Sequence, residues 1–84
     1  MSWTLQFTTT VRREIGKLDP SVLSQLELDL QVLAANPLGG KLLHGRLKGM
    51  RSWRSGDYRI VYGIDAPRYI MVYRVAHRRE VYRD

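Results

Sequence analysis

The sequence predicts an α+β fold in which a strand and a two-helix antiparallel hairpin precede a three-stranded antiparallel meander. Apolar and polar residues alternate in residues 2–8 and again from residue 51 onward, which is typical of strands with one buried face. Between these regions leucines recur at helical spacing. We expect one four-stranded sheet with both helices on one face, followed by a short C-terminal tail or helix.

The composition is that of one folded domain spanning residues 1–84. Hydrophobic residues make up 44% of the chain and charged residues 26%, a balance typical of globular proteins. Because the chain has no cysteine, disulfides and thiolate metal sites are excluded, and a cytoplasmic location is expected. A basic-then-apolar leader and a long apolar run are both absent, which predicts neither export nor a membrane span.

The two halves of the chain differ in charge. Residues 1–40 contain three Lys/Arg against four Asp/Glu (net −1), and residues 41–84 contain eleven against four (net +7). A basic half of this kind indicates a polyanionic partner. The alternative is a basic surface that only keeps the protein soluble. Because the cations are interleaved with aromatic and β-branched residues, a binding face is favoured.

A strand and a short helix are predicted in the first 18 residues. Every second side chain of the strand is apolar, and the threonines at residues 8–10 can cap the helix with their hydroxyls. The apolar residues of the helix follow at i, i+4 and i+7, forming one stripe of Val11, Ile15 and Leu18.

A longer helix follows, with Asp19 as its N-cap and Pro20 as its first helical residue. It ends at Ala35, because the residue before Pro37 avoids the helical region. Its apolar face belongs to the core and consists of Leu23, Leu26, Leu30 and Leu33.

Residues 38–49 form a glycine-rich loop that presents Lys41, His44, Arg46 and Lys48. The loop lacks the glycine spacing of a phosphate-binding loop before a helix, so it is not predicted to bind nucleoside triphosphates. Its cations either grip a phosphate backbone or are only solvated, and the sequence favours neither interpretation.

A β-hairpin is predicted over residues 51–62, with Gly56-Asp57 as a two-residue type II′ turn. Glycine suits the first turn position because it adopts a positive φ without steric cost. The turn sets a register of four opposite pairs: Ser55 with Tyr58, Arg54 with Arg59, Trp53 with Ile60, and Arg51 with Tyr62. The side chains of Trp53, Tyr58, Ile60 and Tyr62 should then lie together.

The same register places Arg54 and Arg59 directly opposite each other on the reverse face. Like charges at such positions destabilise a sheet, so a negatively charged ligand is expected there. A last strand over residues 69–76 should follow a four-residue turn at 65–68. Arg59 would then face Arg74 and extend the row to three arginines, whereas a slip of one residue would move Arg74 to the other face.

The residues exclude several kinds of active site. His44 and His77 are the only histidines, and no carboxylates are spaced to complete a zinc site with them. Paired catalytic acids and a nucleophile elbow are also missing from the sequence. What remains is a group of arginines and Tyr82. Guanidinium groups bind phosphate and stabilise charge that develops on a phosphorane, and RNA carries its own nucleophile in the 2′-OH.

Three segments resemble the RelE/ParE superfamily of bacterial and archaeal toxin–antitoxin toxins. They are residues 41–49, 54–62 and 75–82, which look like the central loop, the hairpin and the C-terminal signature of that family. The length and the order of elements agree as well, so the resemblance covers nearly the whole chain. It implies a single RelE-like toxin domain of the RelE branch at residues 1–84.

The RelE branch implies a ribosome-dependent endoribonuclease that cuts mRNA in the ribosomal A site without a metal ion or other cofactor. Translation is thereby inhibited, and an acidic, RelB-like antitoxin silences the toxin. By this resemblance Arg59 stabilises the transition state, Arg78 lies near the leaving group, and the catalytic set is Arg54, Arg59, Arg78 and Tyr82. The surrounding residues expected to bind RNA are Lys41, Arg46, Lys48, Arg51, Arg74, His77 and Arg79.

One position departs from the family pattern. A second basic residue is expected two positions before Arg54, where this chain has Ser52. The general base is therefore left open among Tyr82, His77 and an Arg51 turned inward by a bulge in the strand. Two other functions compete with the nuclease: non-enzymatic inhibition of DNA gyrase, as in the ParE branch, and RNA binding without catalysis.

Overall fold

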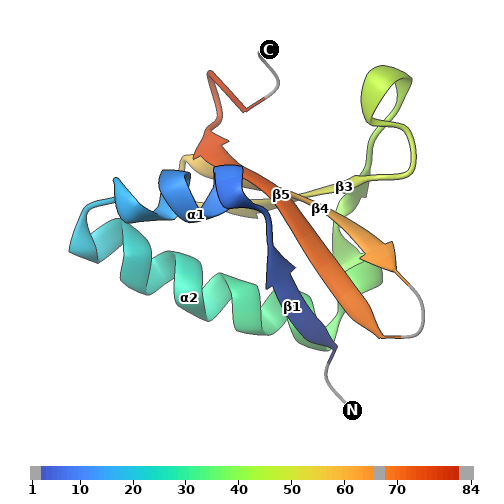
Figure 1. Ribbon diagram of the computed structural model, residues 1–84, viewed down its shortest axis with the longest axis horizontal. Helices are drawn as coiled ribbons and strands as arrows, with labels where there is room; N and C mark the ends of the chain where they lie inside the picture. Colours follow the sequence, from blue (N-terminus) through green and yellow to red (C-terminus); the bar gives the residue numbers. More distant parts are fainter. Residues whose placement is uncertain (1–2, 66–67, 82–84) are drawn as a thin grey trace.

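The computed structural model describes residues 3–65 and 68–81, and Figure 1 shows α1 and α2 on one side of the sheet. The strands lie side by side in the order β1-β5-β4-β3-β2. Two short 3₁₀ turns, Pro37–Gly39 and Gly45–Leu47, flank β2. The elements are β1 Thr4–Phe7, α1 Thr9–Gly16, α2 Pro20–Ala35, β2 Lys41–Leu42, β3 Arg51–Ser55, β4 Tyr58–Asp65 and β5 Tyr69–His77.

The α+β class, the two helices and the antiparallel meander of β3, β4 and β5 are confirmed. The predicted number of four strands is wrong, because β2 pairs with β3 and makes a five-stranded sheet. A strand of two residues is too short to produce an alternating pattern, so the sequence did not indicate it. At the other edge β1 runs parallel to β5, and the sheet is therefore mixed. Within the described residues no helix is long and apolar enough to span a membrane.

The core lies between the helices and one face of the sheet. It contains Val11, Leu26, Leu30, Leu33, Ala34, Ile60, Tyr62, Ile70, Val72 and Val75. Leu23 and the predicted stripe residues Ile15 and Leu18 pack against this cluster, as do Trp53 and Tyr58. The opposite face of the sheet carries a smaller cluster of Val61, Ala76 and Val81, against which Leu43 and Met50 pack.

The predicted helix starts are confirmed. Thr8 caps α1, since its side chain accepts a hydrogen bond from the backbone nitrogen of Val11 at 3.1 Å. Asp19 precedes α2, and Pro20 is its first residue, although the Asp19 side chain makes no capping hydrogen bond.

The register of β3 and β4 is the predicted one at every pair, including Arg54 opposite Arg59. Gly56 has a φ of 60°, and no residue other than glycine has a positive φ in the part of the chain that is described. A positive φ at the first turn position alone fits the type II′ turn, because type I′ requires it at both.

The register of β4 and β5 differs from the prediction. Arg59 faces Ala76 and Arg74 faces Val61, so a row of three arginines is wrong. Two one-residue shifts explain the difference: the link between Asp65 and Tyr69 has three residues instead of four, and a bulge falls beside Val61. Either shift alone would reverse the face of Arg74, and together they restore it. Arg74 therefore shares the face of Arg59 but lies one row away.

The prediction for the turn at 65–68 included Ala66 and Pro67, which lie outside the described residues.

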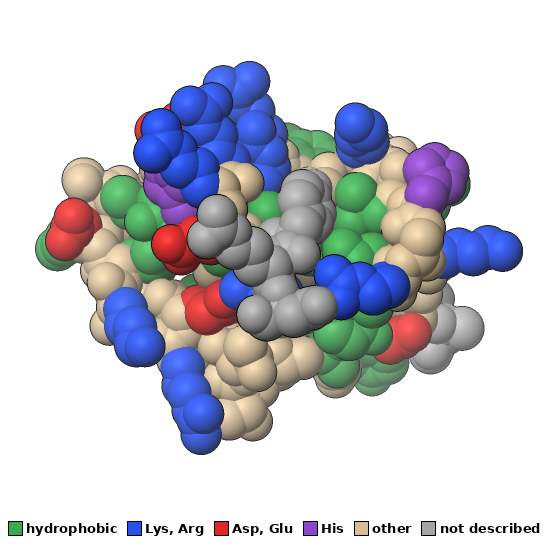
Figure 2. Space-filling view, turned by 90° about the horizontal axis from the view of Figure 1, so that it is seen from above, with side chains coloured by type: hydrophobic (Ala, Val, Ile, Leu, Met, Phe, Trp, Pro, Cys, Tyr) green, Lys and Arg blue, Asp and Glu red, His purple; other side chains and the backbone are tan. Residues whose placement is uncertain are grey.

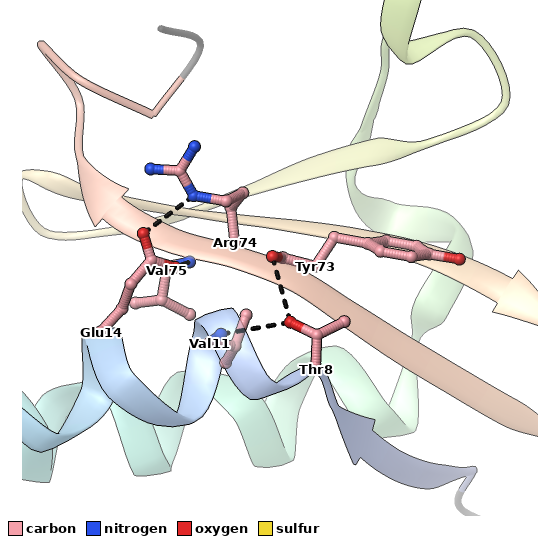
Figure 3. A network of polar contacts seen from close by, with 6 residues as sticks. All are labelled: Thr8, Val11, Glu14, Tyr73, Arg74 and Val75. Atoms are coloured by element: carbon pink, nitrogen blue, oxygen red, sulfur yellow. Dashed lines mark hydrogen bonds and ion pairs between the residues drawn. The ribbon is translucent and has the colours of Figure 1, made fainter. Parts of the chain in front are cut away.

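Helix α1 covers the part of the β5 edge that β1 leaves unpaired (Figure 3). Thr8 Oγ1 donates to the carbonyl oxygen of Tyr73 at 3.5 Å. The Glu14 carboxylate accepts from the backbone nitrogen of Val75 at 2.9 Å and from Arg74 Nε at 2.8 Å. These side chains replace a neighbouring strand, since an uncovered edge would expose unpaired backbone groups.

Tyr62 connects the sheet to the segment after α2. Its side chain is fully buried, and its hydroxyl donates to the carbonyl oxygen of Pro37 at 2.7 Å and accepts from Gly40 N at 3.1 Å. Burial raises the pKa of Tyr62, against smaller lowering effects of the Gly40 amide and of Arg51. A Cβ at position 40 would collide with the Tyr62 hydroxyl, so glycine is required for this approach.

Tyr62→Phe should lower the free energy of unfolding by about 1–3 kcal/mol, because buried groups of Pro37 and Gly40 lose their partner. The folded state holds the hydroxyl proton more tightly than the unfolded chain, whose tyrosine pKa is about 10. The Tyr62 contribution should therefore be constant below about pH 10 and decrease above it. Urea unfolding at neutral pH and at about pH 11 measures both effects.

The control is Tyr69→Phe, since Tyr69 is 38% exposed. It should change the free energy of unfolding by less than about 0.5 kcal/mol. Equal losses in the two variants would show that the Tyr62 hydroxyl does not hold the segment.

Candidate functional site

Three of the four predicted catalytic residues meet at the turn between β3 and β4. Arg54 lies directly opposite Arg59, and the backbone nitrogen of Arg78 donates to the carbonyl oxygen of Asp57 at 2.7 Å. Arg54 and Arg78 are exposed and Arg59 is half-buried. The pairing of β5 with β4 thus brings the segment after β5 to the turn. We call Arg54, Arg59 and Arg78 the arginine cluster.

Backbone carbonyls accept hydrogen bonds from the opposed guanidinium groups. Arg54 Nε and Arg59 Nη1 each lie 3.4 Å from the carbonyl oxygen of Gly56, and Arg59 Nη1 also donates to Tyr58 O at 3.1 Å. Contacts of 3.4 Å are long hydrogen bonds, and each guanidinium group has five N–H donors. Most of these donors are therefore left for an anion from outside.

Helix α2 holds the same turn from the other face of the sheet. Ser55 Oγ donates to Asp29 Oδ2 at 2.6 Å, and Gln25 Nε2 donates to both carboxylate oxygens of Asp29 at 3.2 Å. Sequence reasoning missed this contact. The signal available in the sequence was the place of Ser55 two residues from Trp53, on the same face of the strand. In the structure Ser55 is 5% exposed.

Lys41, another predicted RNA-binding cation, lies on the face of the arginine cluster. Lys41 is opposite Ser52, which is two residues from Arg54 and therefore on the same face. Three further predicted cations are exposed. Arg46 and Lys48 lie in the loop between β2 and β3, and Arg79 follows β5. Figure 2 shows one dense group of Lys and Arg side chains on the upper face and more isolated ones around it.

Two predicted RNA-binding arginines have partners inside the fold. Arg51 Nη1 donates to the carbonyl oxygens of Leu38 and Gly40 at 3.2 and 3.0 Å. Because β3 pairs with β4 without a register shift, the bulge that would turn Arg51 inward is absent, and Arg51 shares the helix-covered face with Tyr62. Arg74 is paired with Glu14.

The strand register shows on which face of the sheet His77 and residue 52 lie, and so whether either can act as the general base beside the arginine cluster. His77 lies opposite Tyr58 on the helix-covered face. The two rings are arranged edge to face, with their centroids 5.7 Å apart. His77 Nδ1 accepts from the backbone nitrogen of Arg79 at 3.2 Å. Ser52 is on the face of the arginine cluster and is 8% exposed, so position 52 offers a hydroxyl there in place of a cation.

Tyr82, the fourth predicted catalytic residue, lies outside the described residues. Val81, directly before it, is 2% exposed and packs with Val61 and Ala76. Ala76 is the residue opposite Arg59. The chain leading to Tyr82 is therefore anchored on the face that carries the arginine cluster.

A family model described as the ParE toxin of type II toxin–antitoxin systems, parDE, matches residues 2–82. The chain belongs to this toxin family. It is 41% identical over 86 residues to Toxin RelG of Mycobacterium tuberculosis, covering 99% of each chain. The resemblance to the RelE/ParE superfamily is thus confirmed, and the protein is a RelE-type toxin of a type II toxin–antitoxin system.

Solved structures agree with this assignment. In the toxin–antitoxin complex RelBE2 of Mycobacterium tuberculosis a chain with 39% identity superposes with a TM-score of 0.82, covering 92% of this toxin and 99% of that chain. In the intact RelBE complex of E. coli the identity is 26% and the TM-score 0.75, covering 90% of this toxin and 96% of that chain.

Asp29→Ala should loosen the turn that carries the arginine cluster, because Ser55 and Gln25 lose their acceptor. We expect a loss of about 1 kcal/mol in the free energy of unfolding and faster hydrogen exchange at Gly56 and Asp57. Asp29→Asn keeps an acceptor for Ser55 and should behave nearly as the wild type.

The matched control is Glu27→Ala, an exposed carboxylate on the same helix. It should shift the free energy of unfolding by less than about 0.5 kcal/mol and leave exchange at the turn unchanged. If Asp29→Ala and Glu27→Ala behaved alike, the turn would not be held by α2.

Proposed function

We propose that the toxin is an endoribonuclease that cuts mRNA in the ribosomal A site and so inhibits translation in the cytoplasm. The observation that carries the proposal is the meeting of Arg54, Arg59 and Arg78 at one turn, with two of them opposed across the strands. Such an arrangement favours an anionic ligand, and guanidinium groups match the geometry of a phosphodiester. The RelE-type relatives support the same function by analogy.

The reaction would use the nucleophile of the RNA itself. The 2′-oxygen attacks the adjacent phosphorus, and the bond from phosphorus to the 5′-oxygen of the next nucleotide breaks. The products are a 2′,3′-cyclic phosphate and a 5′-hydroxyl. A base takes the proton of the 2′-OH, and an acid returns one to the departing oxygen. Tyr82 is our candidate for one of these transfers.

Each arginine has a distinct proposed task. Arg59 stabilises the charge on the phosphorane, Arg78 the charge on the departing 5′-oxygen, and Arg54 binds the phosphate. Because a guanidinium group presents positive charge in a planar fork of donors, the arginines would supply this stabilisation without a metal ion. The proposed reaction is therefore metal-independent.

The ribosome would supply orientation. His77 lies on the helix-covered face, and residue 52 is a serine, so neither position offers a base beside the arginine cluster. Holding the 2′-oxygen in line with the scissile bond contributes as much as about 7–11 kcal/mol to lowering a barrier. We therefore expect rapid cleavage on translating ribosomes and slow cleavage of free RNA.

We propose that a RelB-like antitoxin silences this toxin. The relatives from Mycobacterium tuberculosis and E. coli form complexes with antitoxins. Here residues 41–84 carry a net charge of +7, from eleven Lys/Arg and four Asp/Glu, which favours an acidic partner segment over the arginine cluster. Such a segment would neutralise the cations and keep the toxin off the ribosome.

Arg59→Ala and Arg78→Ala should each lower the rate of mRNA cleavage by about 10²–10³-fold, because a preorganised donor to the developing charge is lost. Arg59→Lys keeps the charge without the planar fork and should fall between Arg59→Ala and the wild type. The measurement is the rate of cleavage on purified ribosomes in the presence of a chelator. Mapping of mRNA ends in growing bacteria should show cleavage in phase with the codons.

The matched control is Arg12→Ala, since Arg12 is an exposed arginine on α1 outside the arginine cluster. It should cleave as fast as the wild type. Growth arrest with DNA damage and intact mRNA would contradict the nuclease and indicate gyrase inhibition. If Arg59→Ala arrested growth as strongly as the wild type, the active site would lie elsewhere.

A further inference from the structure

The loop between β2 and β3 encloses a hollow outside the arginine cluster. It has a volume of about 290 Å³ and is lined by Leu43, His44, Arg46 and Leu47. The two leucines are half-buried and form apolar walls, and His44 and Arg46 are exposed. The volume falls just below the range of roughly 300–1,000 Å³ that holds drug-sized ligands, so it suits a single ring system.

The loop around the hollow is held in shape without a ligand. Gly45 and Gly49 adopt φ values of 68° and 91°, which favour glycine. Backbone hydrogen bonds join Lys48 N to Gly45 O at 3.1 Å, Met50 N to Leu47 O at 2.9 Å, and Leu43 N to Met50 O at 2.9 Å. A preformed site avoids the entropy of ordering the loop when a ligand binds.

One lining residue of the hollow reaches the face of the sheet that carries the arginine cluster. Leu43 lines the hollow and also packs against the cluster of Val61, Ala76 and Val81. Ala76 in turn lies opposite Arg59. Along β3, Arg51 lies three residues, or about 10 Å, from Arg54, and the loop that lines the hollow lies beyond Arg51 on the side away from Arg54. An RNA strand of several nucleotides could contact both sites.

The charge of the loop favours an anionic polymer. Residues 41–50 contain three Lys/Arg and no Asp or Glu, the cations being Lys41, Arg46 and Lys48. Imidazole and guanidinium groups are planar, and unpaired bases of RNA stack on such planes. Apolar walls with cations at the rim therefore match a base and its phosphate better than a phosphate alone.

We propose that this hollow binds one unpaired base of an RNA, with His44 and Arg46 stacking on the ring or flanking it, while the scissile phosphate lies at the arginine cluster. The inference rests on the proposed function and adds to it a base-binding subsite away from the reacting atoms. Both mRNA and ribosomal RNA offer such a base, and cleavage maps on translating ribosomes distinguish the two sources.

Nuclear magnetic resonance of the purified toxin tests the subsite without cleavage. The probes are AMP, GMP, CMP and UMP, with ribose 5-phosphate as the probe that lacks a base. Amide shifts over residues 43–47 should saturate with the nucleotides, at affinities about tenfold or more above that for ribose 5-phosphate. His44→Ala should remove most of this difference, whereas His44→Phe, which keeps a ring for stacking, should retain it.

Arg46→Ala should also weaken nucleotide binding, and its matched control is Arg13→Ala, because Arg13 is an exposed arginine on α1. It should leave nucleotide affinity unchanged, and equal unfolding temperatures would show that all variants are folded. The proposal is overturned if ribose 5-phosphate binds as tightly as the nucleotides, or if His44→Ala binds them as the wild type does. The absence of amide shifts with any nucleotide would also overturn the proposal. If the His44→Ala/Arg46→Ala double variant then escaped neutralisation by the antitoxin, the hollow would bind a protein instead.

Cleavage maps on translating ribosomes identify the source of the base. If the base belongs to mRNA, His44→Ala should change the distribution of cleaved codons. If it belongs to ribosomal RNA, the rate should fall at all codons without a change in their distribution. Lack of cleavage by the wild type would refute the proposed nuclease, while the nucleotide titration would still decide the subsite.

Discussion

The structure depends on the pairing of β3 with β4, which the glycine turn at Gly56 sets in one register. Because opposite residues share a face of a sheet, this pairing decides at once which side chains enter the core and which remain outside. Trp53 and Ile60 go to the helices, and Arg54 and Arg59 go to the open face. A shift by one residue would bury the arginines and expose the aromatic residues.

The same turn brings two positively charged side chains together. Two like charges oppose each other there, which costs stability, and the fold offsets part of that cost locally. The Gly56 carbonyl accepts hydrogen bonds from both arginines, and α2 holds the turn from behind through Ser55 and Asp29. A charged pair on a firmly held turn is suited to bind an anion, because little reorganisation is needed when the anion arrives.

The four arginines on strands β3, β4 and β5 fall into two groups that look the same in the sequence. Arg51 and Arg74 are used to build the fold, one by binding carbonyl oxygens near Pro37–Gly39 and the other by pairing with Glu14. Arg54 and Arg59 bind carbonyl oxygens of the hairpin through one nitrogen each, Nε of Arg54 and Nη1 of Arg59. What separates the groups is the origin of the acceptor: Arg51 and Arg74 bind groups of other elements, whereas Arg54 and Arg59 bind carbonyl oxygens of their own hairpin.

The sequence by itself determined the helices, the hairpin, its register and the family, because these depend on local patterns of apolar residues, turn chemistry and motifs. The tertiary structure alone decided the fifth strand, the register of β5 and the partners of individual arginines. A link one residue shorter than expected and a bulge beside Val61 moved Arg74 out of the row of Arg59, and neither leaves a mark in the alternation of side chains. Arg78 reaches the turn through the long antiparallel pairing of β4 with β5. Contacts between residues far apart in sequence depend on small shifts that accumulate along the strands, so only the folded chain shows which side chains meet.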